Sequence, residues 1–274
     1  MMKEETFQGT GGKIAFRSWL PAGAPRAVLV ICHGFNAHSG QYAWPAEQFS
    51  GKGLAVYAAD LRGRGKSEGM PRFYVEKMDD YVSDLAGMIK LAKSRHPGLK
   101  VFLLGHSAGG ATSVAYTLDY QSELAGLICE SFAYKVPGPM FALGLFKWLG
   151  MYIPKVGVLK LKNKDFSRDP THVAMLDADP LIKNEAQPIG TLAALVRNAE
   201  RLHAEFPKIT LPVLILHGTA DHATVPAGSQ EFYDRANSTD KQLKLYKDHY
   251  HDLLADIGKE GVIADIQGWL DTHI

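Results

Sequence analysis

The segment Val101-Phe-Leu-Leu-Gly-His-Ser107-Ala-Gly109 joins an apolar, strand-like run to a Gly-x-Ser-x-Gly motif. Small residues continue after the motif, which is typical of a helix whose first turn packs closely against a sheet. A turn of this kind holds its serine at a strained, exposed corner, within reach of a base and of a substrate carbonyl. We therefore interpret Ser107 as a nucleophile. The alternative is a serine that only caps the helix.

A second Gly-x-Ser-x-Gly match, Gly65-Lys-Ser67-Glu-Gly69, lies in a stretch rich in glycine and charge. No strand pattern runs directly into it, and Pro71 stands where a helix would begin. The same stretch resembles a phosphate-binding loop, but Asp60 occupies the first glycine position of that motif. We expect Ser67 to be an ordinary loop serine.

Composition indicates one large α/β domain with an insertion. The chain has 274 residues, 46% hydrophobic residues and a net charge of +1, so it can bury a sizeable core and shows no charge excess for nucleic acid. The N-terminus lacks the apolar run of a signal peptide, and no stretch of about 18 apolar residues indicates a membrane span. We expect a cytoplasmic protein.

Strand and helix patterns alternate along most of the chain, which predicts a mostly parallel sheet with helices on both faces. The first two strands, 4–8 and 14–19, are expected to pair antiparallel across a glycine-rich turn. The clearest helix, 78–94, carries its apolar side chains on one face. The buried strands are expected at 27–31, 54–59, 101–104, 124–129, 213–216 and 241–246.

The alternation stops between Ser131 and Pro207, where prolines and helical or irregular patterns leave no convincing strand. This segment is too long for a loop in a compact sheet protein. We interpret it as a helical cap, residues 131–207, inserted into a core formed by residues 1–130 and 208–274.

A nucleophilic serine needs a base to take its proton and an acid to hold that base in the right tautomer. Asp221 follows the expected strand 213–216, and His251 follows the strand 241–246. Because the carboxyl ends of parallel strands share one edge of a sheet, both side chains should converge on Ser107. Their order along the chain, Ser, Asp, His, is the order expected for α/β-hydrolases.

Other residues compete for these roles. Asp221 could merely close a turn, with Asp252 or Glu130 supplying the acid. A metal site built from histidines has no interpretable ligand spacing, so we expect no metal. A serine nucleophile with its base and acid needs no cofactor, so we expect none. The alternatives to His251 as the base are His249 and His222, and the histidines considered as metal ligands are His217, His222, His249 and His251.

The expected strand 27–31 runs into Cys32-His-Gly-Phe-Asn36. The loop after this strand normally supplies one backbone donor of an oxyanion hole, and the residue after the nucleophile supplies the other. We assign these donors to the N–H groups of Phe35 and Ala108. His33 is interpreted as a structural histidine that holds the loop by hydrogen bonds.

Five stretches of the chain carry a family resemblance: His33-Gly-Phe-Asn-Ala-His-Ser-Gly-Gln-Tyr42, Asp60-Leu-Arg-Gly-Arg-Gly-Lys-Ser-Glu-Gly69, Gly105-His-Ser-Ala-Gly-Gly110, Leu211-Pro-Val-Leu-Ile-Leu-His-Gly-Thr-Ala-Asp221 and Tyr250-His251. Together they resemble the monoacylglycerol lipase and lysophospholipase group of α/β-hydrolases. The resemblance supports the triad Ser107, Asp221 and His251, with Phe35 and Ala108 as oxyanion donors. Close relatives tend to carry a smaller residue at the position of Phe35, whose bulk could narrow the substrate site.

The reaction implied by this resemblance is hydrolysis of a small-molecule acyl ester through an acyl-enzyme, with monoacylglycerols as the expected substrates. Two alternatives stay open. One is a lysophospholipase or an esterase acting on small synthetic esters, such as aryl or phthalate monoesters. The other is a ligand-binding receptor that keeps the fold and the triad with negligible turnover, because one fold hosts many functions.

Two cysteines, Cys32 and Cys129, stand at the ends of expected buried strands. In the strand order usual for this fold another strand lies between them, which separates them by roughly 9–10 Å at about 4.8 Å per strand. A disulfide spans Cα separations of up to about 7 Å, so free thiols are expected.

The expected cap combines an apolar run with positive charge. Residues 131–164 include six lysines and no acidic residue, around the apolar run 139–153. This run is either a roof buried over the active site or a lid that makes peripheral contact with an anionic membrane. We expect Phe146 and Trp148 to be the cap residues that meet the substrate.

Overall fold

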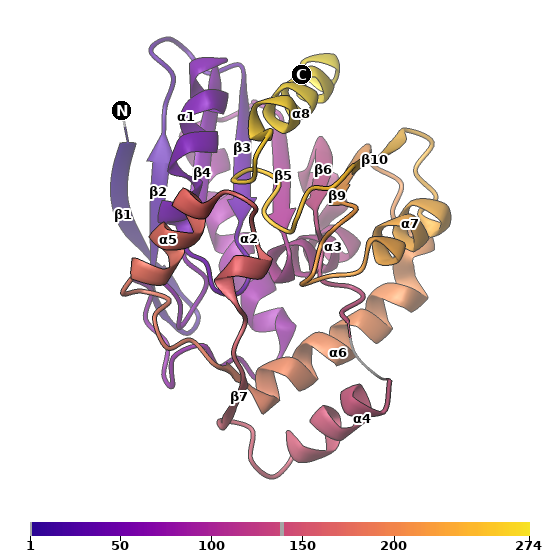
Figure 1. Ribbon diagram of the computed structural model, residues 1–274. Helices are drawn as coiled ribbons and strands as arrows, with labels where there is room; N and C mark the ends of the chain where they lie inside the picture. The colour runs from indigo at the N-terminus through magenta and orange to yellow at the C-terminus, as the bar shows by residue number, and fades with distance from the viewer. Residues whose placement is uncertain (1, 138–139) are drawn as a thin grey trace.

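An eight-stranded sheet forms the centre of the protein in the computed structural model, which describes residues 2–137 and 140–274 (Figure 1). Its strand order is β1-β2-β4-β3-β5-β6-β9-β10. β2 pairs antiparallel with both β1 and β4, and the other neighbours are parallel. The strands are β1 (Met2–Gly9), β2 (Gly12–Trp19), β3 (Ala27–Cys32), β4 (Leu54–Ala59), β5 (Val101–His106), β6 (Gly126–Glu130), β9 (Val213–Gly218) and β10 (Lys241–Tyr246).

Helices cover both faces of this sheet, as the alternating pattern predicts (Figure 1). Helices α1 (Ala43–Gly51) and α8 (Lys259–His273) pack on one face. The other face is covered by α2 (Met78–Arg95), α3 (Ala108–Tyr120) and α7 (Pro226–Arg235), and α6 (Ile189–Glu205) packs against α3 and α2. None of the helices in the described ranges has the length and apolar character needed to cross a membrane.

The central strands are buried on both sides. In β3, Val28 and Val30 pack into the core shared with α2 and α3, whereas Leu29 and Ile31 pack into the core shared with α1 and α8. Successive side chains of a strand point to opposite faces, so a strand between two helical layers needs a continuous apolar run. This requirement is why the apolar pattern located these strands.

The parallel strands end at a common edge. Cys32 lies opposite Gly105, Gly105 lies opposite Cys129, and Glu130 lies opposite Leu216 in the strand register. The loops that follow β3, β5, β6 and β9 therefore leave the sheet at the same level. This edge carries the residues that the motifs single out.

The chain between β6 and β9 forms helices α4 (Met140–Leu149), α5 (Pro170–Ala178) and α6. It also contains two short strands, β7 (Gly157–Leu159) and β8 (Gln187–Pro188), which pair antiparallel. The expectation that this segment holds no strand is therefore wrong. Strands of three and two residues, one of them carrying a proline, are too short to produce an alternating pattern in the sequence.

Strand β5 lies between β3 and β6, so Cys32 and Cys129 flank Gly105 from opposite sides, and both cysteines are free. This arrangement confirms the prediction from the strand order. Both thiols are buried, and burial raises the pKa of Cys32 to about 12 and also raises that of Cys129.

We expect the native protein to resist alkylation, because both thiols are buried and protonated near neutral pH. After denaturation without reductant, intact-mass measurement should show two alkyl adducts per chain. An unalkylated chain with a mass lower by two protons would reveal a disulfide and contradict the strand order.

Candidate active site

Ser107 occupies a strained position between β5 and α3. Its backbone has φ 56° and ψ −124°, a conformation that residues with side chains rarely adopt and that concentrates at functional sites. Three backbone hydrogen bonds hold it there. Ser107 N–H donates to Glu130 O at 3.0 Å, and Ser107 O accepts from the N–H groups of Ala111 at 3.1 Å and Ala133 at 2.9 Å. This is the sharp strand-to-helix turn that the motif predicts.

Glycines let the loop after β3 approach this serine closely. A Cβ atom at Gly34 would lie 2.6 Å from Ser107 Cβ and 3.2 Å from Ser107 Oγ. A Cβ atom at Gly109 would collide with the carbonyl oxygens of Cys32 and His33. The β3 loop therefore reaches the nucleophile because these two positions lack a side chain.

The two amides assigned to the oxyanion hole flank this contact. Phe35 follows Gly34, and Ala108 follows Ser107 as the first residue of α3, where helical N–H groups have no partner within the helix. Over residues 2–137 and 140–274, neither N–H donates a hydrogen bond to another backbone group. Both are available to bind a developing oxyanion.

His33 holds the β3 loop, which confirms its structural interpretation. Its Nε2 accepts the N–H of Leu61 at 3.0 Å, and its Nδ1–H donates to Gly34 O at 2.8 Å. Burial lowers the pKa of His33 to about 4. The ring is therefore neutral near pH 7 and can accept and donate at the same time.

Asp221 and His251 form a buried pair at the same edge of the sheet. Asp221 Oδ2 accepts from His251 Nδ1 at 2.8 Å, and Asp221 Oδ1 accepts the N–H groups of Ala223 at 2.7 Å and Thr224 at 2.9 Å. Burial raises the pKa of Asp221, but the charge of His251 and the hydrogen bonds around the carboxylate outweigh burial and hold this pKa well below its ordinary value. Asp221 is therefore ionised and fixes the proton of His251 on Nδ1, which leaves Nε2 to accept a proton.

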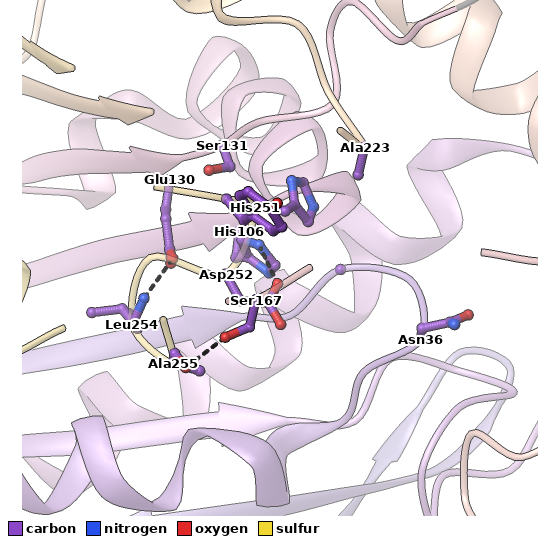
Figure 2. Close-up of polar contacts among 12 residues, drawn as sticks. Asn36, His106, Glu130, Ser131, Ser167, Ala223, His251, Asp252, Leu254 and Ala255 are labelled. Carbon is purple, nitrogen blue, oxygen red and sulfur yellow. Dashed lines mark hydrogen bonds and ion pairs between the residues drawn. The ribbon is translucent and has the colours of Figure 1, made fainter. Parts of the chain in front are cut away.

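Glu130, the first alternative acid, has a different environment. It ends β6, and its Oε1 accepts the N–H of Leu254 at 3.1 Å (Figure 2). Burial raises the pKa of Glu130 to about 8, so this carboxyl is mostly uncharged near neutral pH. An uncharged carboxyl cannot stabilise an imidazolium as an ionised Asp221 can.

Asp252, the second alternative acid, belongs to a polar cluster that the sequence did not reveal. Its Oδ1 lies 3.2 Å from His106 Nε2, and its Oδ2 lies 3.3 Å from His172 Nε2. His106 Nδ1 in turn hydrogen-bonds the Tyr42 hydroxyl at 3.0 Å. The rings of His106 and His251 are 4.7 Å apart, and both residues lie near Asp252 in Figure 2. Asp252 therefore places negative charge near His251 without holding its Nδ1.

The pKa of His251 reflects opposing effects. Burial lowers it, whereas the charge and hydrogen bond of Asp221, together with the charge of Asp252, raise it above its ordinary value. Phe166 packs against the imidazole, with the two rings 5.2 Å apart. The base is thus shielded from water on this side and surrounded by groups that favour its protonated form.

The competing histidines contact other groups. His249 Nδ1 lies 3.9 Å from Asp256, and the His222 ring packs on Tyr250 at 4.7 Å. Among the described residues, the ligand atoms that gather within 4.8 Å belong to His106, His251 and Asp252. The set of histidines considered for a metal in the sequence does not form this group.

Ser67 is a structural loop serine, as expected. Its hydroxyl is buried, accepts the N–H of Ala15 at 2.8 Å and donates to the carbonyl of Asp60 at 2.5 Å. Its hydrogen-bonding capacity is used within the loop.

Two hollows lie near the turn that carries Ser107, although Ser107 is not among the described residues that line either of them. A cavity of about 30 Å³ reaches His106 and Phe35 and has a partly polar wall that includes Asn36, Gln41, His172 and Asp252. A groove of about 770 Å³ begins at Ala133, whose N–H binds the Ser107 carbonyl, and extends between α4 and α6. The apolar side chains along the groove are Ala133, Val136, Leu195, Val196, Ala199 and Val225.

Phe146 and Trp148 are not among the residues that line these two hollows in the described ranges. Trp148 lies at the surface of α4, where its ring packs on Tyr152 at 5.2 Å. Their role in meeting a substrate stays a prediction.

The chain matches a known protein family and is similar to several lipases of known sequence or structure. The model of the Hydrolase_4 family, described as serine aminopeptidase, S33, matches residues 23–258. Monoacylglycerol lipase of Mycolicibacterium smegmatis is 32% identical over 99% of this chain and 98% of its own length, and monoglyceride lipase of Homo sapiens is 31% identical over 94% and 86%. The crystal structure of Paleococcus ferrophilus monoacylglycerol lipase superposes with a TM-score of 0.85 at 31% identity, covering 98% of this chain and all of that chain.

Mutation of Asp221 and mutation of Asp252 should have different effects on ester turnover. Asp221→Asn should lower ester turnover on the order of 10⁴-fold, because the amide stabilises the wrong tautomer of His251. His251→Ala should be similarly impaired, whereas Asp252→Asn and His249→Ala should keep substantial activity. Steady-state hydrolysis of a p-nitrophenyl ester measures all four. An inactive His249→Ala beside an active His251→Ala would reverse the assignment.

The same variants differ in their pH profiles. His251 acts as a base only when neutral, and its raised pKa places the acidic limb of kcat/KM above about pH 6.5. Asp252→Asn removes a charge that favours the imidazolium, so this limb should move to lower pH. A limb that stays in place would show that Asp252 does not act on His251.

Proposed function

The chain belongs to the Hydrolase_4 family of α/β-hydrolases and is a serine carboxylester hydrolase, and we propose that it cleaves monoacylglycerols through an acyl-enzyme formed on Ser107. The observation that carries the catalytic assignment is the 2.8 Å contact between Asp221 and His251, whose ring lies 4.7 Å from that of His106, the residue before the strained serine. The names of the relatives supply the substrate class.

The proposed reaction has two similar halves. His251 Nε2 takes the Ser107 proton while Oγ attacks the ester carbonyl, and the oxyanion accepts hydrogen bonds from the N–H groups of Phe35 and Ala108. The tetrahedral intermediate collapses to the acyl-enzyme, and His251 gives its proton to the departing alcohol. Water then attacks the acyl-enzyme by the same route, which releases the fatty acid and restores the serine. Asp221 stabilises the imidazolium in both halves.

The two hollows near the Ser107 turn support the assignment of the substrate as a single-chain ester with a small polar alcohol. The groove that includes Ala133 is mainly apolar, and its volume falls in the range typical of sites for small-molecule ligands. The cavity beside His106 offers amide, imidazole and carboxylate groups, which suit hydroxyl groups better than a second acyl chain. We infer that the acyl chain lies in the groove and the alcohol lies toward the cavity.

A substrate panel tests this proposal. We expect kcat/KM for 1-monoacylglycerols to rise with acyl length, since each buried methylene contributes about 0.8 kcal/mol, and to exceed the values for lysophosphatidylcholine, phthalate monoesters and an aminoacyl amide. A preference for lysophosphatidylcholine or for aryl esters would replace the substrate assignment. Stoichiometric labelling of Ser107 without turnover of any ester would instead favour a receptor.

We further propose that residues 131–207 form a cap whose outer surface makes peripheral contact with an anionic membrane. Trp148 is 54% exposed, and Met151 and Tyr152 are each 68% exposed, which favours a lid over a buried roof. Figure 1 places α4, which carries Trp148, on the far side of α6 from the sheet. Of the six lysines in residues 131–164, two pair with acids, Lys135 with Glu231 and Lys147 with Glu200.

The other four lysines of residues 131–164 are exposed and make no ion pair with the described residues; they are Lys155, Lys160, Lys162 and Lys164. Each lysine near an anionic surface contributes about 1 kcal/mol to binding, and apolar side chains can enter the headgroup boundary. A single-chain lipid could then pass from the membrane to Ser107 without crossing water.

Vesicle binding provides the test. We expect cosedimentation with phosphatidylserine vesicles that weakens as salt rises, and a Trp148→Ser/Tyr152→Ser variant that loses binding and long-chain turnover but keeps hydrolysis of a short-chain ester. Met70→Ser/Ile257→Ser, which changes exposed apolar residues elsewhere, is the matched control and should bind like the wild type. Absence of wild-type binding at low salt would remove the membrane proposal.

A further inference from the structure

The bulky side chain of Phe35 is packed in the core of the protein. Phe35 is buried, and the Arg64 guanidinium carbon lies 4.2 Å from the centre of its ring. Arg64 itself is fully buried in the loop after β4. A stacked guanidinium of this kind holds an aromatic ring in one orientation.

The backbone of Asn36, the residue after Phe35, is also fixed by its contacts. Its backbone adopts φ 51°, in the left-handed region that most residues avoid. Its N–H donates to Glu185 Oε1 at 2.9 Å, and its side-chain amide donates to Asn163 Oδ1 at 3.2 Å. Figure 2 shows the Asn36 side chain directed away from His106 and His251.

One buried ion pair connects these two contacts. Arg64 Nη1 pairs with Glu185 Oε1, the same oxygen that accepts the Asn36 N–H. Both side chains are almost completely buried, and Gln187 bridges them, accepting from Arg64 Nη2 at 2.9 Å and donating to Glu185 Oε1 at 2.6 Å. Tyr81 accepts a further hydrogen bond from Arg64 Nε at 3.0 Å.

We propose that Arg64 and Glu185 are positioning residues that aim the Phe35 N–H at the oxyanion. The direction of this N–H depends on the backbone torsions around Phe35. These torsions are restrained by the stacking of the Phe35 ring on Arg64 and by the hydrogen bond from the Asn36 N–H to Glu185. The proposal rests on the proposed function, because it needs the Phe35 amide to stabilise the tetrahedral intermediate.

The same contacts connect the loop after β3 to the segment between β6 and β9. Glu185 precedes β8, and Asp179, from the same segment, accepts from His38 at 2.7 Å in the loop after β3. The segment that we propose as the cap therefore supplies two of the carboxylates that hold this loop. A displacement of residues 179–185 would misalign the Phe35 amide and slow the chemical step.

Glu185→Ala tests the proposal directly. With a short-chain ester we expect kcat to fall about 10- to 100-fold while KM changes little, because only an interaction that strengthens in the transition state is lost. The affinity for a trifluoromethyl ketone, whose hemiketal oxyanion needs the same amide, should fall by a similar factor. An unchanged kcat in a folded Glu185→Ala protein, or a change confined to KM, would overturn the proposal.

Asp84→Ala is the matched control. Asp84 is a buried residue of α2 that pairs, at 2.7 Å, with Arg62, and Arg62 lies in the same loop as Arg64. In the described residues Asp84 makes no contact to the loop after β3. It should lower the melting temperature as Glu185→Ala does but leave kcat within about threefold of the wild type. An equal loss of kcat in both variants would indicate a general effect of destabilisation and contradict a positioning role.

A second pair of variants covers the case in which Glu185→Ala does not fold. Arg64→Met/Glu185→Met and Arg64→Met/Glu185→Gln both remove the two buried charges, which proteins tolerate when the shape is kept. The two differ in that glutamine can still accept the Asn36 N–H. We expect the glutamine variant to turn over at least several-fold faster, and equal rates would refute the role of this hydrogen bond.

The outcomes also separate this proposal from the proposed function. If the wild-type protein hydrolyses no ester, the proposed function fails. If the wild type is active and Glu185→Ala is equally active, only the positioning role fails.

Discussion

The close approach of the β3 loop to Ser107 is the constraint on which the rest of the site depends. It exists because neither Gly34 nor Gly109 has a Cβ atom, so one backbone can lie directly against another. The contact lies next to Phe35, which follows Gly34, and to Ala108, which follows Ser107, and Ser107 itself keeps an unfavourable backbone conformation there. The surrounding hydrogen bonds and the buried sheet stabilise that conformation.

Around this fixed backbone, two buried carboxyl groups differ in charge. The one that contacts the base His251 is ionised, and the other is largely neutral. Asp221 is held in its charged form by His251 and by hydrogen bonds, whereas burial keeps Glu130 mostly protonated near pH 7. Asp252 adds a second negative charge that favours the imidazolium of His251. The site therefore stabilises a positive charge on His251, and in the proposed mechanism the Phe35 and Ala108 amides stabilise the negative charge on the substrate.

Sequence patterns predicted the parts of the site that follow from local rules. A motif located Ser107, and the ends of apolar strands located Asp221 and His251, because a parallel sheet brings such ends together. The contact between Arg64 and Glu185 could not be predicted, since the two residues are 121 positions apart and only the three-dimensional fold pairs them. The strands β7 and β8 were missed because they are too short to leave a periodic pattern.

Covalent labelling of the serine tests the central claim most directly. One equivalent of a fluorophosphonate probe should add to the protein at neutral pH, and peptide mapping should place the adduct on Ser107. Ser107→Ala should remain unlabelled, and Ser67→Ala should be labelled at the wild-type rate, because the Ser67 hydroxyl is already bound within its loop. An adduct on Ser67, or labelling that persists in Ser107→Ala, would contradict the assignment of the nucleophile.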